Sequence, residues 1–150
     1  MSFSVEVRAN LGAVRVAGRA VLIAGPPGAG KSLLALELID GGGVLIGDDG
    51  VTLEARGDRL WVSPPPNIAG LLEVRNVGLV KQPVSAGFAA IYVELCDAAP
   101  RHVDALPHWS ALGCRVPHLV LDPAVGANAI RLRHALTAYG LPQREGDERA

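Results

Sequence analysis

Residues 19–40 read RAVLIA (19–24), GPPGAGKS (25–32) and LLALELID (33–40), and this stretch decides the fold. The apolar run from Ala20 to Ala24 is typical of a short strand that is buried on both faces. The loop 25–32 contains three glycines and two prolines, which excludes regular structure. Residues 31–40 are rich in helix-forming side chains, and Gly41–Gly43 end the helix that they predict. The sequence therefore predicts a strand, a loop and a helix in succession.

The loop matches the phosphate-binding pattern G-x-x-x-x-G-K-[ST]. Glycines allow successive backbone N–H groups to face a phosphate, and the following helix directs its positive end at the same oxygens. Lys31 adds a full positive charge, and the Ser32 hydroxyl is a ligand for Mg²⁺. Because the chain contains only two lysines, a chance match is rare, and the alternative is a plain turn between strand and helix. The candidate nucleotide-binding residues are Gly25, Pro26, Pro27, Gly28, Ala29, Gly30, Lys31 and Ser32.

Two carboxylates follow the next predicted strand, Val44–Ile46. Asp48 and Asp49 come 17 and 18 residues after Lys31, and the carboxyl ends of strands in an open parallel sheet line the ligand crevice. A carboxylate there can orient hydrated Mg²⁺ or accept a proton from an attacking hydroxyl. Asp49, Asp48 and Lys31 are therefore the candidate catalytic residues, although Gly-Asp-Asp-Gly is also ordinary turn composition. Glu73 is a further candidate, although its pattern alone favours an outward-facing strand residue.

Composition limits the classes of protein that the chain can be. Its 150 residues are 49% apolar and 19% charged with a net charge of -1, which predicts one soluble domain and argues against nucleic-acid or membrane-surface binding. The sequence contains no apolar run of membrane-span length and no signal-peptide pattern at its start, so we expect a cytoplasmic protein. Cys96 and Cys114 lack CxxC spacing and are expected to be reduced and buried, with a disulfide as the alternative.

The remaining predicted elements complete an α/β domain over residues 1–140, followed by a polar tail over 141–150. The last helix of the chain is expected over 127–139. Residues 98–113 are interpreted as irregular, and the tail from Gln143 is expected to fray. Strands are expected as an edge hairpin over 5–16, as a second hairpin around Arg56–Arg59, over 71–80, over 89–95 and over 116–121.

These segments together resemble the catalytic domain of the HPr kinase/phosphorylase family, in the short α-proteobacterial form that lacks an extra N-terminal domain. The resemblance runs over most of residues 5–140. It depends on the loop 25–32, on the double aspartate that ends LIGDD (45–49), and on IAGLLEVRNVGLV (68–80), which is similar to the family signature. It implies a P-loop domain with a mixed central sheet, similar to the nucleotide-binding fold of phosphoenolpyruvate carboxykinase. Members of the family are commonly hexameric, so a homo-oligomer is expected.

The resemblance also implies a role for each candidate residue. The loop 25–32 would hold ATP, and Ser32 with Glu73 would hold Mg²⁺. Asp49 would take the proton from a seryl hydroxyl of HPr, the phosphocarrier of the phosphotransferase system, and would return it in the reverse phosphorolysis. Asp48 would support the metal and its waters. The expected function is an ATP- and Mg²⁺-dependent protein serine kinase, also a phosphorylase, with HPr as its partner.

Three positions depart from the family pattern. Asn10 stands where the family usually has a catalytic-site histidine, and its uncharged amide should weaken transition-state stabilisation. Ala105 stands at an expected arginine position, with Arg101 close enough to substitute, and Asn76 stands where the signature often has glycine. Two other functions are therefore open. One is a catalytically weakened nucleotide-binding regulatory module of the same fold, and the other is a small-molecule kinase of shikimate kinase type, for which residues 98–115 would form the lid.

Overall fold

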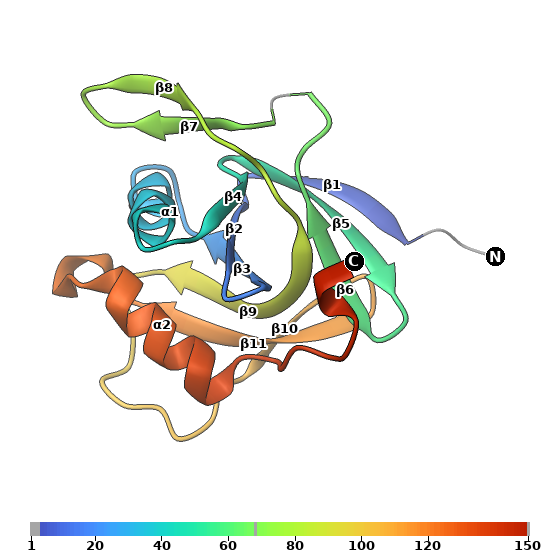
Figure 1. Cartoon of the computed structure of the whole chain (residues 1–150). Coiled ribbons are helices and arrows are strands. Elements are labelled where there is room, and N and C mark those ends of the chain that lie inside the picture. Colours follow the sequence, from blue (N-terminus) through green and yellow to red (C-terminus); the bar gives the residue numbers. More distant parts are fainter. Residues whose placement is uncertain (1–3, 68, 150) are drawn as a thin grey trace.

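The computed structural model describes residues 4–67 and 69–149, and Figure 1 shows its elements. Met1–Phe3, Ile68 of the signature-like segment, and Ala150 lie outside the described residues. Two helices, α1 (Lys31–Asp40) and α2 (Asn128–Tyr139), accompany two short 3₁₀ turns at Pro123–Val125 and Asp147–Arg149. The strands of the main sheet are β1 (Val5–Ala9), β2 (Gly12–Val16), β3 (Arg19–Ala24), β4 (Val44–Gly47), β5 (Gly50–Arg56), β6 (Arg59–Ser63), β9 (Gly87–Leu95), β10 (His108–Ala111) and β11 (Cys114–Leu121). β7 (Leu71–Val74) and β8 (Gly78–Lys81) form a separate hairpin.

The main sheet is mixed, as the resemblance implies, and it is curled. Along the order β1-β5-β6-β9-β3-β2-β4, β3 and β9 are parallel and the other neighbours are antiparallel. β11 pairs in parallel with the end of β9, and β10 pairs antiparallel to β11. Because β2 is antiparallel to both β3 and β4, β3 and β4 run in the same direction. Their carboxyl ends therefore lie at the same end of the sheet. The loop after β3 and the carboxylates after β4 therefore lie at one end of the sheet.

Each face of the sheet carries its own hydrophobic core. Both helices lie over one face, where Val21 and Ile23 of β3 contribute to a core with α1 and α2 (Figure 1). Leu22 and Ala24 point to the other face, where the curled sheet packs against itself. The alternation of side chains along a strand explains why the predicted β3 is buried on both sides.

Residues 5–16 form two strands, but the predicted edge hairpin is wrong. β1 pairs with β5 at the edge of the sheet, whereas β2 lies in the interior between β3 and β4. The chain turns between them at Asn10, which has a φ of 62° and donates its backbone N–H to the carbonyl of Asp49 at 3.1 Å. Asparagine tolerates this left-handed conformation, so the two strands take different partners instead of pairing with each other.

Two further segments differ from the sequence predictions. Residues 71–80 form a hairpin rather than one strand, because the chain reverses through Asn76 (φ 68°) and Gly78 (φ 121°). Residues 98–113 include β10, which is held by pairing with β11 and by stacking of Trp109 on Tyr92. The hairpin around Arg56–Arg59, the last two predicted strands and the last helix are confirmed.

The end of the chain packs against the sheet instead of fraying. Asp147 is 7% exposed and accepts hydrogen bonds from Arg59 Nη1 at 2.9 and 2.8 Å and from the backbone N–H of Arg144 at 2.8 Å. Arg144 in turn forms a bidentate ion pair with Asp58, in the turn between β5 and β6, at 3.0 and 2.8 Å. The Arg144 N–H and then Arg59 hold the pKa of Asp147 below its usual value, and the Arg144 guanidinium does the same for Asp58.

Candidate active site

The loop between β3 and α1 begins with a turn and opens directly into the helix. The backbone N–H of Ala29 bonds to the carbonyl of Pro26 at 3.0 Å, and the N–H of Leu34 bonds to the carbonyl of Gly30 at 3.0 Å. Gly28 and Gly30 adopt φ values of 81° and 103°, which favour glycine, and no atom lies within 4 Å of where a Cβ would be placed on either. No side chain caps α1 at Gly30. The N–H groups of the first helical turn are therefore available to an anion.

Lys31 directs its charge back onto this loop. Its Nζ donates to the carbonyl of Gly25 at 2.7 Å and lies 3.3 Å from the carbonyl of Pro26. Both acceptors belong to the first two residues of the loop, so the ammonium lies over the loop rather than out in solvent. This position adds a full positive charge to the partial charges of the helix start.

Asp48 connects three separate elements. The Ser32 hydroxyl in α1 donates to Asp48 Oδ1 at 2.7 Å, and the backbone N–H of Glu73 in β7 donates to Asp48 Oδ2 at 3.0 Å. The predicted proximity of Asp48 to the loop is therefore confirmed, and its cause is the common direction of β3 and β4. The carboxylate of Glu73 is itself exposed on β7, while its backbone joins the site through Asp48.

Asp49 lies in the same turn but faces different neighbours. Its side chain is exposed, and its carbonyl accepts the backbone N–H of Asn10 at 3.1 Å. A Cβ on Gly47 would lie 2.0 Å from the carbonyl oxygen of Gly50, so this tight turn requires glycine at position 47. The turn thus presents one carboxylate to the loop and leaves the next one open to solvent. Asn10, the position of the expected histidine, contacts the main chain of Asp49.

The other departures from the family pattern have different surroundings. Arg101 and Ala105 are exposed in the segment between β9 and β10, and within residues 4–67 and 69–149 neither forms a hydrogen bond or ion pair with the loop. Asn76 occupies the left-handed turn position of the β7–β8 hairpin, where asparagine is the best replacement for glycine. The substitution at position 76 is therefore structurally conservative.

The oxygen donors at the loop suit a hard cation. Within residues 4–67 and 69–149, no group of three or more His, Cys, Asp or Glu side chains is arranged to hold a metal ion. A hydroxyl and a carboxylate that lie together, as in Ser32 and Asp48, are donors that Mg²⁺ prefers, and Mg²⁺ takes its other ligands from water and phosphate. The site therefore fits Mg²⁺ that is carried by a phosphate group better than a metal held by protein side chains alone.

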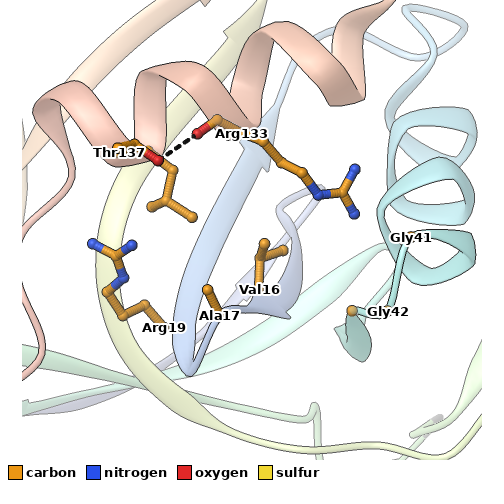
Figure 2. A pocket seen from close by; sticks show the side chains of 9 residues that line it. Val16, Ala17, Arg19, Gly41, Gly42, Arg133 and Thr137 are labelled. Atoms are coloured by element: carbon orange, nitrogen blue, oxygen red, sulfur yellow. Dashed lines mark hydrogen bonds between the residues drawn. The ribbon is translucent and has the colours of Figure 1, made fainter.

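A cavity of about 370 Å³ lies at the opposite end of α1 (Figure 2). Two arginines on its wall already bond to the backbone: Arg133 Nη2 donates to the carbonyl of Leu38 and Arg19 Nη1 to that of Leu141, each at 3.0 Å. The first bond ties α1 to α2 and the second ties the segment after α2 to β3, which is a structural role. The cavity is lined by Val16, Ala17, Arg19, Gly41, Gly42, Gly43, Arg133, Leu136 and Thr137.

Two expectations from composition can be compared with the structure. Both cysteines are free, with Cys114 buried and Cys96 only half-buried. None of the helices in the described part of the chain is long and apolar enough to cross a membrane.

A group of polar and aromatic side chains at the same end of the sheet was not predicted. Glu94 and His118 lie within hydrogen-bond distance of each other, at 2.9 Å, beside the stacked rings of Tyr92 and Trp109. The one signal in the sequence is Glu94, a charged residue within the apolar run from Phe88 to Leu95. The histidine and the tryptophan come from other strands, so only the tertiary structure brings them together.

Fold and site together define a mixed α/β domain in which a glycine-rich loop joins a buried strand to a helix and a carboxylate contacts the first helical turn. The solved structure of the Hpr(Ser) kinase/phosphatase from Coxiella burnetii has the same fold, with a TM-score of 0.75 and 23% identity over 89% of this chain and 88% of that chain. Residues 2–94 match the family described as HPr Serine kinase C-terminal domain, and the chain belongs to this family. The family resemblance is thereby confirmed.

Curated relatives agree with this assignment. The chain is 40% identical over 78 residues to the HPr kinase/phosphorylase of Mycoplasmopsis pulmonis, covering 52% of this chain and 25% of that protein. It is 38% identical over 104 residues to that of Clostridium botulinum (strain Eklund 17B), covering 69% and 33%. It is 30% identical over 161 aligned positions to that of Clostridium beijerinckii, covering 91% and 52%. The chain thus spans between a quarter and about half of the length of these relatives.

Proposed function

We propose that the chain is an ATP- and Mg²⁺-dependent protein serine kinase that phosphorylates HPr and catalyses the reverse phosphorolysis. The observation that carries the proposal is the contact of Asp48 with both Ser32 and the backbone of Glu73, at 2.7 and 3.0 Å. Ser32, Asp48 and the backbone of Glu73 lie together at the end of the glycine-rich loop, which supports a metal site there. Membership of the family and the names of the relatives support HPr as the acceptor.

The proposed nucleotide site is the loop Gly25–Ser32, used as a P-loop in a fold similar to that of phosphoenolpyruvate carboxykinase. The free N–H groups of α1 and the ammonium of Lys31 supply positive charge, which explains how a chain with a net charge of -1 can bind a polyanion. Because the proposed reaction consumes ATP, we propose that the chain acts in the cytoplasm. We also propose a homo-oligomer, as in the family.

The proposed metal ligands are the Ser32 hydroxyl and the Glu73 carboxylate, with Asp48 orienting the waters of the ion. When bound, Mg²⁺ neutralises charge on the transferring phosphoryl group. The backbone of Glu73 is fixed by Asp48, so its exposed carboxylate extends from a strand that is already attached to the site. For this reason we expect Ser32 of the loop and Glu73 of the hairpin to bind the same ion.

Asp49 is the proposed proton acceptor. It takes the proton of the seryl hydroxyl as that oxygen bonds to the γ-phosphorus and the bond to ADP breaks. In the reverse direction, an oxygen of inorganic phosphate bonds to the phosphorus of phosphoserine. The seryl oxygen leaves with the proton from Asp49, and pyrophosphate is the product. The exposure of the Asp49 side chain suits a base that must meet a protein substrate.

One observation favours a second function. Asn10, rather than a histidine, lies beside Asp49 and touches its carbonyl through the backbone. An amide can donate a hydrogen bond to a phosphoryl oxygen but carries no charge, so transfer would be slow. The second candidate is therefore a nucleotide-binding regulatory module with weak catalysis.

A transfer assay separates these functions. Purified chain is mixed with γ-labelled ATP, Mg²⁺ and HPr from the same organism, and labelled HPr is measured beside nucleotide affinity. The kinase predicts labelled HPr, and Asp49→Asn should reduce its rate by about 10²-fold or more while nucleotide affinity is unchanged. Nucleotide binding without transfer would identify the regulatory module. Full activity of Asp49→Asn would show that another group is the base.

A further inference from the structure

Five side chains that the mechanism does not use lie beside the candidate active site, at the end of the sheet where β3 and β4 finish. They come from β1, β9, β10 and β11, and they contact one another by aromatic packing, a histidine–carboxylate hydrogen bond and a cation–π contact. We call them the rim cluster: Arg8, Tyr92, Glu94, Trp109 and His118.

Strand register places one side of the rim cluster against the glycine-rich loop. β3 and β9 are parallel with Ala24 opposite Glu94, and Ala24 is the last residue before the loop begins at Gly25. Residues directly opposite each other in a sheet point to the same face. Ala24 belongs to the core on the face away from the helices. Glu94 therefore emerges next to the loop, on the face opposite α1.

Contacts continue from Glu94 across the neighbouring strands. His118 Nε2 lies 2.9 Å from Glu94 Oε1, and the imidazole meets the edge of Tyr92 with the ring centroids 5.0 Å apart. Tyr92 stacks on Trp109 with centroids 4.3 Å apart and an interplanar angle of 9°. Burial, and then the Glu94 charge, raise the pKa of Tyr92, whereas Arg8 opposes the shift. All four side chains are only half-buried, so they lie at the surface of the second core.

Arg8 extends this row of side chains onto β1, the strand that leads to the contact with the main chain of Asp49. Its guanidinium lies 5.6 Å from the Trp109 ring centroid. Two residues further along the chain, the Asn10 backbone bonds to Asp49. Asp48, the residue before Asp49, accepts a hydrogen bond from Ser32 at the end of the loop. Loop, rim cluster and both aspartates therefore lie at the same end of the curled sheet.

We propose that the rim cluster is the surface on which the polypeptide acceptor rests while its serine reaches Asp49, an inference that depends on the proposed function. Trp, Tyr and Arg are the residue types that dominate the energetics of protein–protein contacts, and here three of them adjoin a half-buried acid and imidazole. One face of the Trp109 ring is stacked on Tyr92 and Arg8 also lies against the ring, which disfavours stacking of a nucleobase. The groups left at the surface suit hydrogen bonding and edge packing with a folded partner.

Intrinsic fluorescence gives a direct test, because the chain has only two tryptophans. In the Trp61→Phe variant, Trp109 is the single reporter; Trp61 packs against Phe88 and Arg56 on other strands, away from the rim cluster. The protein is titrated with HPr in the absence of nucleotide. The proposal predicts a saturable change in the emission of Trp109, since binding alters its exposure. The reciprocal variant Trp109→Phe, which keeps Trp61, should show none.

Kinetics test the same surface without the reporter. Arg8→Ala and Glu94→Ala should each raise the KM for HPr by about tenfold, with kcat, the KM for ATP and Tm unchanged. The matched control is Glu54→Ala, which removes a half-buried strand glutamate that is paired with Arg56 and does not belong to the rim cluster. A purely structural role would lower Tm and leave the KM for HPr unchanged.

The outcomes separate the two proposals. Transfer to HPr with an unaltered KM in both variants and no Trp109 response would overturn the docking surface and leave the kinase intact. A Trp109 response without transfer would support the surface and reject the reaction. Neither transfer nor response would reject both.

Discussion

The two ends of the curled sheet are closed in different ways. At the end where β5 finishes, Asp58, Arg59, Arg144 and Asp147 pair with one another and attach the end of the chain to the β5–β6 turn. At the end where β5 begins, the carboxylates of Asp49 and Glu73 are exposed and the glycine-rich loop has open space beside it. Charges that pair internally stabilise, whereas charges left open can act on a ligand. Stability and chemistry are therefore assigned to different ends of the same strands.

Among the variants that test this contrast, the largest loss of activity is expected at Lys31. The variant Lys31→Ala should lower nucleotide affinity and transfer by about 10²-fold or more, because it removes the one full charge over the loop. Its Tm should match that of the wild type, since the ammonium bonds only to carbonyls of its own loop. Calorimetric titration with an ATP analogue and thermal unfolding measure the two quantities. A clear drop in Tm would mean that Lys31 stabilises the fold, which contradicts the contrast.

A smaller effect is expected at Asp48, which contributes both to the stability of the hairpin and to the candidate active site. In Asp48→Ala, trypsin should cleave the β7–β8 hairpin at Arg75 and Lys81 several-fold faster than in the wild type, because the bond to the Glu73 backbone is lost. Ser32→Ala is the matched control, since it removes the other bond of Asp48 and leaves the hairpin bond in place. Leu72, which is fully buried, keeps the hairpin on the core in both variants. Equal cleavage of the two variants would show that Asp48 does not hold the hairpin.

The smallest effect on activity, and the opposite pattern, is expected at the other end. Asp147→Asn should lower Tm while transfer to HPr is unchanged, because the bonds from Arg59 and Arg144 weaken far from the loop. The pKa of Asp147 is lowered in the folded protein, so its contribution is present above the ordinary pKa and is lost as the pH falls through the folded value. The Tm difference between wild type and variant should therefore disappear in strong acid. A difference that is independent of pH would exclude the ionised carboxylate as its cause.

The parts that the sequence predicted are those encoded by local pattern. β3, the loop and α1 follow from an apolar run, glycines and helix formers in direct succession, and the parallel direction of β3 and β4 brings Asp48 to Ser32. The parts that it missed depend on distant partners. β1 pairs with β5 instead of β2, and β10 depends on the Tyr92–Trp109 stack. The end of the chain depends on Arg59, 88 residues away from Asp147. The catalytic roles of the candidate residues stay predictions.

The hydrogen bond between Ser32 and Asp48 has a consequence for how a cation would be met. A serine hydroxyl has one proton and two lone pairs. The proton of Ser32 is already donated to Asp48, so only the lone pairs of its oxygen are left to meet a new partner. The hydroxyl is already fixed in orientation in the folded protein, so binding does not have to restrict its rotation. Its orientation favours a ligand that accepts an electron pair over one that accepts a proton. The site is thus oriented toward electrophiles before any arrives.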